Sequence, residues 1–444
     1  MKRLKILALI ILCHLSLFVN ASSLEIIRDA ELESFTKKIV NSLVKDSEID
    51  LDEINYYFIK SNDINAFVTS GNNLFINTET LISADDYREY ASVLAHELAH
   101  ILGGHVSRTK QEISNLGSRA FPIYVLGILG ILGGAAETGI ATLMVGSASV
   151  QDGFTYYSRT QEASADQSAI RLLCNNKIDG KYLIDFFNKL DKAIPYSTAQ
   201  TSYRSTHPII SERTTWVESA LLNQFNNCEF SQDKDLQNEF LLLKAKLFGF
   251  THSGNETNAI YHSDTSVDKY AKAVASYFSG DHDYSIKLLK ELIEHDPKNP
   301  FFRELIGEIF FSKHEYEIAI QYQETSIELL KEETDLYYMM IGNYHLANAK
   351  KTNYPKSIKS LKKSLRLNPK NTYSWYLLAK AYAETDSLPL AEYATAERYY
   401  LIQNYKMAQQ FAVKSLKNIE KNTTEWYRAN DLLNIINNMQ IQDS

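Results

Sequence analysis

Ala95-His96-Glu97-Leu98-Ala99-His100 is the most informative stretch of this sequence, because it indicates a helix and a chemistry together. It lies within residues 85–101, which contain no Pro or Gly and which we predict to be helical. Residues four apart on a helix lie one above the other, so His96 and His100 can direct an imidazole nitrogen at one zinc ion. Glu97 lies beside them, where a carboxylate can act as a general base. The stretch therefore predicts a metal site on a helix.

This pattern has the chemistry of peptide-bond hydrolysis. Zinc lowers the pKa of a water molecule and polarises a carbonyl, while Glu97 takes the water's proton during attack. The three residues occur at this spacing by chance in about one chain of this length in a hundred, so a third ligand is required. His105 follows Gly103 as in a longer zinc-binding pattern, but one residue too early. On a continuous helix, a residue nine positions after His96 faces away from the metal, so we expect His105 to be structural.

Glu162 is a better candidate for the third ligand. It lies in residues 158–166, which begin a predicted helix, and Asp166 follows one turn later on the same face. An acidic ligand with a second acid behind it fits metal sites in which the outer acid orients a ligand imidazole. A solvated acidic helix face fits these residues equally well. From the residues alone, both interpretations remain open.

The N-terminus, residues 1–21, has the features of an export signal. Three basic residues precede an apolar run from 6 to 19, and a small-x-small cleavage site follows. We expect a mature chain from about Ser22, with an uncleaved anchor helix as the alternative. Removal of the signal leaves Cys174 and Cys228, which either form one disulfide or remain two buried thiols.

The composition predicts a mostly helical, folded chain of more than one domain. The 444 residues allow two or three domains at roughly 150 residues each. Apolar residues at 45% and charged residues at 23% exclude a wholly disordered chain, and only 17 Gly and 8 Pro disfavour an all-β barrel. The net charge of -8 has the wrong sign for a generic nucleic-acid binder, so we expect no nucleic-acid partner.

Around the metal helix, the pattern predicts one earlier amphipathic helix and a small β-sheet. Apolar residues recur at helical spacing from Leu32 to Leu43. Short strand-like runs follow at residues 56–59, 66–69 and 74–77, the last two joined by a hairpin loop. We expect Ser83 to cap the metal helix, with Asp86 at its third position.

The stretch between the metal motifs, residues 120–151, carries no charge except Glu137. Each half is short for a membrane span, and the first is rich in Gly. We expect an apolar lid over the cleft that contacts a membrane or a hydrophobic client. A helical hairpin in the core is the alternative.

The second half shows internal repeats after a seam at residues 229–265, in which 233–250 are predicted to form a helix and 251–258 are polar and turn-rich. Asp296-Pro-Lys-Asn299 returns as Asn368-Pro-Lys-Asn371. A period near 34 residues with paired helices is the tetratricopeptide signature, and we predict about four repeats over residues 266–440, the last degenerate around 390–398. Such an array leaves a concave surface for a peptide or protein partner.

Residues 350–370 carry eight basic and no acidic side chains. Such a run is typical of a solvated helix face. An acidic partner or a lipid headgroup bound to this run is the alternative.

These motifs together resemble one peptidase family. The motifs His96 to His100, Glu162-Ala-Ser-Ala-Asp166, Thr206-His207-Pro208 and Arg213 are similar to those of the gluzincins that include the prenyl-protein and Oma-type peptidases. With the export signal and the repeats, residues 22–440 resemble the periplasmic branch of that family, the β-barrel assembly-enhancing proteases of Gram-negative envelopes.

The resemblance implies a role for each residue of the metal motifs. It implies that one zinc ion per chain is bound by His96, His100 and Glu162. It also implies that Glu97 is the base and that Asp166 supports a ligand.

Further roles come from the resemblance rather than from the residues. His207 is implied to approach the zinc and to hold the enzyme inactive, with Arg213 as its companion on the next helix. Taken alone, a histidine before a proline is more often an ordinary loop residue. Asn65, Ala66 and Phe67 resemble an edge strand that binds substrate by β-addition, which tolerates many sequences.

We therefore predict a mostly α chain with a small β-sheet. A zincin-like α+β metallopeptidase domain over residues 22–250 precedes an all-α tetratricopeptide solenoid over 266–440. The resemblance implies a periplasmic zinc endopeptidase acting on misfolded or stalled envelope proteins, with outer-membrane barrel proteins as clients and the outer-membrane assembly machinery as a partner of the repeats. The alternative is a periplasmic scaffold or chaperone whose zinc site is structural or gated, and only the peptidase needs Glu97 as a base.

Overall fold

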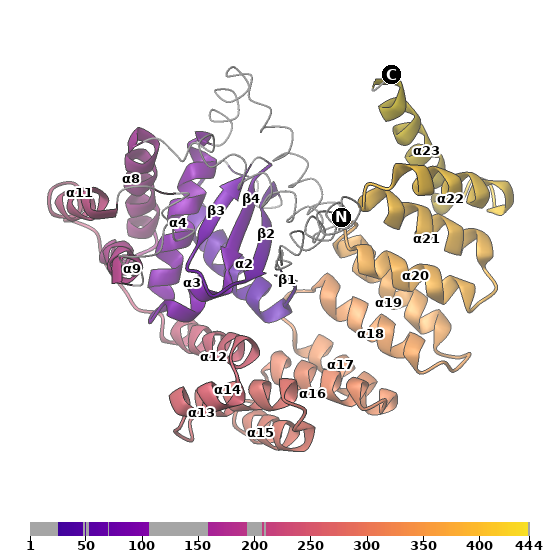
Figure 1. Ribbon diagram of the computed structural model, residues 1–444, viewed down its shortest axis with the longest axis horizontal. Helices are drawn as coiled ribbons and strands as arrows, with labels where there is room; N and C mark the ends of the chain where they lie inside the picture. The colour runs from indigo at the N-terminus through magenta and orange to yellow at the C-terminus, as the bar shows by residue number, and fades with distance from the viewer. Residues whose placement is uncertain are drawn as a thin grey trace, which may run out of the picture.

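The chain forms an α+β domain followed by an array of helix pairs (Figure 1). The computed structural model describes residues 25–47, 49, 53–69, 71–105, 159–192, 207 and 210–442. The predicted class, mostly helical with a small sheet, is confirmed. The predicted signal at 1–21 and the apolar insert at 120–151 lie outside the described residues. Among the helices within them, none combines the length and apolarity needed to cross a membrane.

The sheet holds four strands, in the order β1 (Glu25–Ile27), β2 (Asn55–Lys60), β4 (Asn73–Asn77) and β3 (Ala66–Thr69). β2 runs parallel to β4, whereas β1 and β3 are antiparallel to their neighbours. The three predicted strands are confirmed, and β1 is a strand that we did not predict. Gly71 and Asn72 in the β3–β4 loop have φ angles of 84° and 54°, the left-handed conformation that a tight hairpin turn requires.

Helix α4 (Tyr87–Leu102) carries the H-E-x-x-H motif and follows the short helix α3 (Thr78–Ser83). The prediction that Ser83 caps this helix is wrong. Asp86 is the cap, because its side chain accepts a hydrogen bond from the backbone N–H of Arg88 at 2.9 Å. Ser83 instead ends α3, and its hydroxyl donates to the carbonyl of Thr80 at 3.4 Å.

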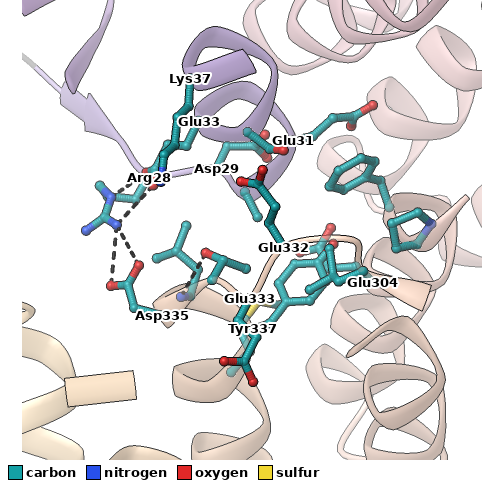
Figure 2. A pocket seen from close by; sticks show the side chains of 18 of the residues that line it. Arg28, Asp29, Glu31, Glu33, Lys37, Glu304, Glu332, Glu333, Asp335 and Tyr337 are labelled. Atoms are coloured by element: carbon teal, nitrogen blue, oxygen red, sulfur yellow. Dashed lines mark hydrogen bonds and ion pairs between the residues drawn. The ribbon is translucent and has the colours of Figure 1, made fainter. Parts of the chain in front are cut away.

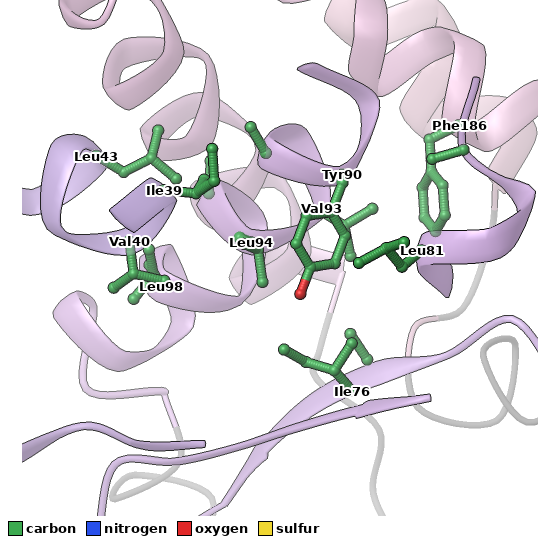
Figure 3. Packing of buried hydrophobic residues seen from close by; sticks show 14 of the residues in the cluster. Ile39, Val40, Leu43, Ile76, Leu81, Tyr90, Val93, Leu94, Leu98 and Phe186 are labelled. Carbon is green, nitrogen blue, oxygen red and sulfur yellow. The ribbon is translucent and has the colours of Figure 1, made fainter. Parts of the chain in front are cut away.

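One apolar core holds α4 against the sheet and against helix α2 (Ala30–Val44). Figure 3 shows Val40 and Leu43 of α2 beside Leu94 and Leu98 of α4, with Ile76 of β4 beneath them. Burial of such side chains contributes about 1.5–3 kcal/mol each. α4 is buried from Glu89 to His100, so its polar motif residues lie inside the domain rather than on its surface.

Among the described residues, this domain contains three further long helices, namely α8 (Arg159–Asn175), α9 (Lys181–Lys192) and α11 (Ile210–Asn223). α8 packs along α4, and α11 packs on α8 and α9. Cys174 of α8 and Cys228, which follows α11, form a disulfide with a Cα–Cα distance of 5.5 Å. Of the two alternatives for these cysteines, the structure contains the disulfide.

The repeat region contains five helix pairs within the described residues. They are α14 (Ser266–Phe278) with α15 (His282–His295), α16 (Pro300–Ser312) with α17 (Tyr316–Leu329), α18 (Asp335–Ala347) with α19 (Tyr354–Leu367), α20 (Thr372–Ala383) with α21 (Leu388–Leu401), and α22 (Tyr405–Asn418) with α23 (Thr424–Gln442). The prediction of about four repeats was one too few. Residues 390–398 belong to the fourth pair, and the fifth pair was missed because its sequence lacks the Gly and Asn-Pro-Lys-Asn signals.

Helix α12 (Lys234–Thr251), which precedes the short helix α13 (Gly254–Ile260), joins the two regions. It packs on α2, α3 and α4 and also on α14. Gly249 permits the second contact, since a Cβ at this position would lie 2.4 Å from the carbonyl oxygen of Ala271. The seam predicted from sequence is therefore spanned by a helix that both regions share.

A cavity of about 1690 Å³ lies between α2 and the repeat helices α16 and α18. Figure 2 shows Arg28, just before α2, reaching across it to Asp335 of α18. The guanidinium of Arg28 donates to Asp335 at 3.2 Å and to Glu33 at 3.1 Å. Asp335 also accepts a hydrogen bond from the side-chain amide of Asn371 at 2.8 Å. This network connects the first domain to two repeats.

Buried charges gather at the same boundary. Lys246 of α12 lies 2.6 Å from Asp29 and 3.2 Å from Glu31. Glu304 of α16 lines the cavity near this cluster, and burial raises its pKa to about 8 although Lys246 acts in the opposite direction. Several charged side chains of both regions therefore meet at this boundary.

Candidate metal centre

Helices α4 and α8 bring three of the predicted ligands together inside the first domain. His96 Nε2 and His100 Nε2 are 3.0 Å apart. The carboxylate of Glu162 approaches them at 3.5 Å each, Oε2 toward His96 and Oε1 toward His100. All three side chains are buried, with at most 1% of their surface exposed. Glu162 and Asp166 therefore do not form a solvated acidic face on α8, which was the alternative prediction.

His207 supplies a fourth donor at the same point. Its Nδ1 lies 3.0 Å from Glu162 Oε1 and 3.4 Å from His96 Nε2, and the donor atoms of the four residues all fall within 4.8 Å of one another. Ligands 2.0–2.2 Å from a tetrahedral zinc ion lie about 3.3–3.6 Å apart. The spacing and the nitrogen and oxygen donors therefore fit one metal ion of this kind.

Asp166 and Arg213 support the donors from behind. Asp166 Oδ1 lies 2.9 Å from His96 Nδ1, the ring nitrogen that faces away from the donor group. Arg213 of α11 donates two hydrogen bonds to Asp166, at 2.9 and 2.7 Å, and its Nη1 lies 2.8 Å from Glu162 Oε2. The guanidinium also packs over the ring of Phe187, 4.4 Å from its centre. Such contacts fix the orientation of a ligand imidazole and a ligand carboxylate.

His105 orients the second histidine. Its Nδ1 lies 3.0 Å from His100 Nδ1, the nitrogen that faces away from the donor group. α4 ends at Leu102 and Gly104 has a φ angle of 62°, so the chain turns back toward the helix. His105 is not among the donors, as we expected, but the continuous helix assumed in that argument does not exist. The sequence analysis did not predict that His105 contacts His100. The two glycines that precede His105 at the end of the helix were the signal that could have indicated it.

The charges around Glu97 differ from those around Glu162. Burial raises the pKa of Glu97 to about 8, and the neighbouring His207, whose Nε2 lies 3.3 Å from Glu97 Oε1, acts against this rise. Burial also opposes ionisation of Glu162, yet His207 and Arg213 hold its pKa well below the usual range. The surroundings of Glu162 therefore favour its charged form, whereas those of Glu97 favour its neutral form.

The predicted substrate strand lies at a sheet edge, as β3 pairs only with β4 among the described strands. Ala66 pairs with Ile76 in the register of this ladder. Asn65 lies just before the strand, and its backbone N–H and C=O are both bonded to Thr80. Of the residues predicted to bind substrate, Ala66 and Phe67 therefore lie on the edge strand and Asn65 anchors it.

The sequence of this chain is similar to that of known proteases. Residues 28–220 match the model of peptidase family M48. The "Beta-barrel assembly-enhancing protease" of Yersinia pestis is 24% identical over 373 residues, covering 82% of this chain and 74% of the relative. A protein of the same name from Escherichia coli (strain K12) is 24% identical over 393 residues, covering 85% and 77%. A crystal structure of MamA matches 38% of this chain and 95% of its own at 16% identity, with a TM-score of 0.29.

Proposed function

We propose that this chain, a metalloprotease whose residues 28–220 match the model of peptidase family M48, is a zinc endopeptidase of envelope proteins. The observation that carries the proposal is the buried group of His96, His100, Glu162 and His207 with Glu97 beside it. Buried imidazole and carboxylate donors that lie this close together are typical of a site for a divalent ion such as zinc.

In this proposal His96, His100 and Glu162 hold the zinc ion. When bound, zinc polarises the peptide carbonyl and lowers the pKa of the attacking water. Glu97 receives the water's proton and later returns it to the leaving amine. Asp166 keeps the imidazole of His96 oriented through its other ring nitrogen, 2.9 Å away.

His207 and Arg213 are proposed to regulate and position the site. His207 lies between Glu162 and Glu97, where an attacking water would need room. A closed set of four protein donors is typical of inactive or structural zinc sites, whereas catalytic sites keep one position open. This observation also favours the second candidate function, a repeat-based scaffold or chaperone whose zinc site is structural or gated.

Substrate is proposed to add a strand to β3 next to Ala66, using backbone hydrogen bonds rather than a specific side-chain pocket. The names of the two relatives support envelope proteins as clients, and we propose misfolded or stalled outer-membrane barrel proteins among them. The predicted export signal at residues 1–21 supports a periplasmic location.

The deciding experiment uses the chain from residue 22 and compares wild type with Glu97→Gln and His207→Ala. Zinc content and cleavage of an unfolded protein are measured together. Glu97→Gln should keep its zinc and lose about 10²–10⁴-fold in cleavage rate. His207→Ala should cleave faster than wild type. Glu212→Gln, an exposed change on α11, is the matched control and should have no effect.

The outcomes separate the two candidates. Full zinc content without cleavage in either wild type or His207→Ala would favour the scaffold. Cleavage retained in Glu97→Gln would exclude Glu97 as the base. Absence of bound zinc would overturn the assignment of the donors.

A further inference from the structure

A row of three aromatic rings crosses the sheet and ends on β3, the strand at its edge (Figure 1). Phe75 of β4 pairs in register with Tyr57 of β2 on one side and with Phe67 of β3 on the other. The ring of Phe75 stacks on both, with centroids 4.9 Å from that of Tyr57 and 5.0 Å from that of Phe67. Neighbouring strands lie about 4.7–4.9 Å apart, so the row places one ring on each strand at the spacing of the sheet.

The row lies on the face of the sheet that is turned away from the metal helix. Ala66 and Val68 of β3 are buried in the core that includes α4. Side chains alternate along a strand, so Phe67 points to the opposite face, where it packs with Phe75. Phe67 is half-buried, and among the described aromatic rings only that of Phe75 stacks on it. Phe67 is therefore the terminal ring of the row at the edge of the sheet.

Polar residues flank this row on both sides. Asn73 and Asn77 lie two residues before and after Phe75 on β4 and share its face. Asn73 pairs in register with Thr69 of β3. On the other side, the backbone N–H of Asn77 donates to the carbonyl of Asn65 at 2.9 Å. On this face, the aromatic surface that β3 offers is therefore confined to one position along the strand.

The backbone of β3 presents this position to a strand added at the edge. Antiparallel pairs alternate between hydrogen-bonded and non-hydrogen-bonded, and Asn65 is bonded to Asn77. Phe67 and Phe75 are therefore a hydrogen-bonded pair, whereas Ala66 directs its backbone groups toward the edge. An antiparallel strand added there would face Phe67 in a non-hydrogen-bonded pair, in which the two side chains lie closest.

We propose that Phe67 selects polypeptides that carry an aromatic side chain at the position facing it on the added strand. That side chain extends the row by one ring at the strand spacing, and aromatic cross-strand pairs are favourable. Residues two positions away face Asn65 and Thr69, where an aromatic ring gains nothing comparable. This inference rests on the strand addition proposed above, and it names the substrate feature that fixes the register of the bound chain.

The test measures binding of dye-labelled peptides to the full chain carrying Glu97→Gln, by fluorescence anisotropy. The host peptide consists of Thr and Ser, and a second peptide has one phenylalanine at its centre. Because a strand can shift its register along the edge, the phenylalanine can reach Phe67 from any starting position. It should tighten binding about 2–10-fold, and a second phenylalanine two residues away should add less than about twofold.

Variants at the two ends of the row separate contact with the peptide from support of the sheet. Phe67→Thr should bind both peptides with affinities within about twofold, whereas Phe67→Tyr should keep the preference. Tyr57→Thr is the matched control, because it removes a ring of the same row two strands away from the edge. This variant should also keep the preference for the peptide with phenylalanine.

A cleavage experiment with the unaltered active site gives an independent check. The wild-type chain should cut the peptide at a constant distance from its phenylalanine when that residue is moved along the host. The reason is that the contact with Phe67 sets the register. Cuts at a constant distance from the peptide ends would contradict the proposal.

Three binding results would overturn the proposal. These are equal binding of the two peptides, a preference that persists in Phe67→Thr, and a loss of preference in Tyr57→Thr as large as that in Phe67→Thr. Absence of binding by every peptide would overturn strand addition and this inference with it. Because binding is measured without cleavage, a preference that depends on Phe67 in a chain that cuts nothing would refute the peptidase function alone.

Discussion

Replacing Asp166 with asparagine removes one negative charge behind the metal centre and preserves the shape of the side chain. Asp166 is fully buried, accepts two hydrogen bonds from Arg213 and lies 2.9 Å from His96 Nδ1. The change therefore affects the orientation of one ligand and the balance of a buried ion pair, but it removes no donor from the metal.

The expected losses in zinc affinity and in folding stability can both be given a magnitude. Loss of a group that orients a ligand imidazole costs about 10–100-fold in metal affinity, or about 1.4–2.7 kcal/mol. Removing one partner of a buried pair costs about 3–5 kcal/mol when the other charge is left alone. Arg213 keeps Glu162 at 2.8 Å, so we expect roughly 2 kcal/mol of lost stability.

The pH dependence of that loss follows from the sign of the pKa shift. Burial opposes ionisation of Asp166, but Arg213 and His96 lower its pKa below the usual value. A carboxyl with a lowered pKa stabilises the folded state above its unfolded pKa, and the contribution disappears as pH falls through its folded pKa. Wild type and Asp166→Asn should therefore differ at neutral pH and converge in acid.

Zinc affinity is measured by competition with a chromophoric chelator, and stability by denaturant unfolding in excess chelator. Asp46→Asn, the same substitution at an exposed site of the first domain, should change neither quantity. Zinc affinity of Asp166→Asn within about twofold of wild type would refute the reasoning, because His96 would then be held by helix packing alone.

Three further changes test the boundary between the regions and the covalent link. Glu304→Gln should raise the melting temperature at about pH 9 and leave it unchanged at about pH 5. Burial raises the pKa of Glu304 to about 8, so ionisation of this carboxyl group above that pH lowers the stability of the folded protein. Equal shifts of the melting temperature at both pH values would contradict this. Reduction of Cys174–Cys228, which closes a loop of 54 residues, should lower the free energy of unfolding by about 2–4 kcal/mol in denaturant titrations, and an unchanged midpoint would argue against the bridge. Alanine substitutions at Arg28 and Asp335 should show a coupling of about 0.5–1 kcal/mol in a double-mutant cycle, whereas additive effects would mean that the pair does not link the regions.

Much of the candidate site could be predicted from the sequence because it depends on local geometry. His96, Glu97 and His100 share one helix, and residues four apart on a helix face the same way in any protein. Glu162 and Asp166 share another helix in the same manner. The spacing within each helix therefore predicted which side chains share a face, whereas the assignment of Glu162 to the histidine pair came from the family resemblance.

Other parts of the site depend on contacts between segments far apart in the chain. His207 lies 45 residues after Glu162 and forms part of the donor group only because α8 and α4 pack side by side. The orientation of His105 was predicted by assuming that the helix continues through it, but the helix ends at Leu102. Neither position could be derived from periodicity, which describes one element at a time.

The sequence by itself determined the metal chemistry, the helical class and the existence of a repeat array, because each is written in the spacing of nearby residues. Only the tertiary structure decided that four donors converge and that α12 belongs to both regions. The physical reason is that such contacts arise from packing of the apolar faces of separate elements. That packing sets distances between side chains that the sequence separates by tens or hundreds of residues.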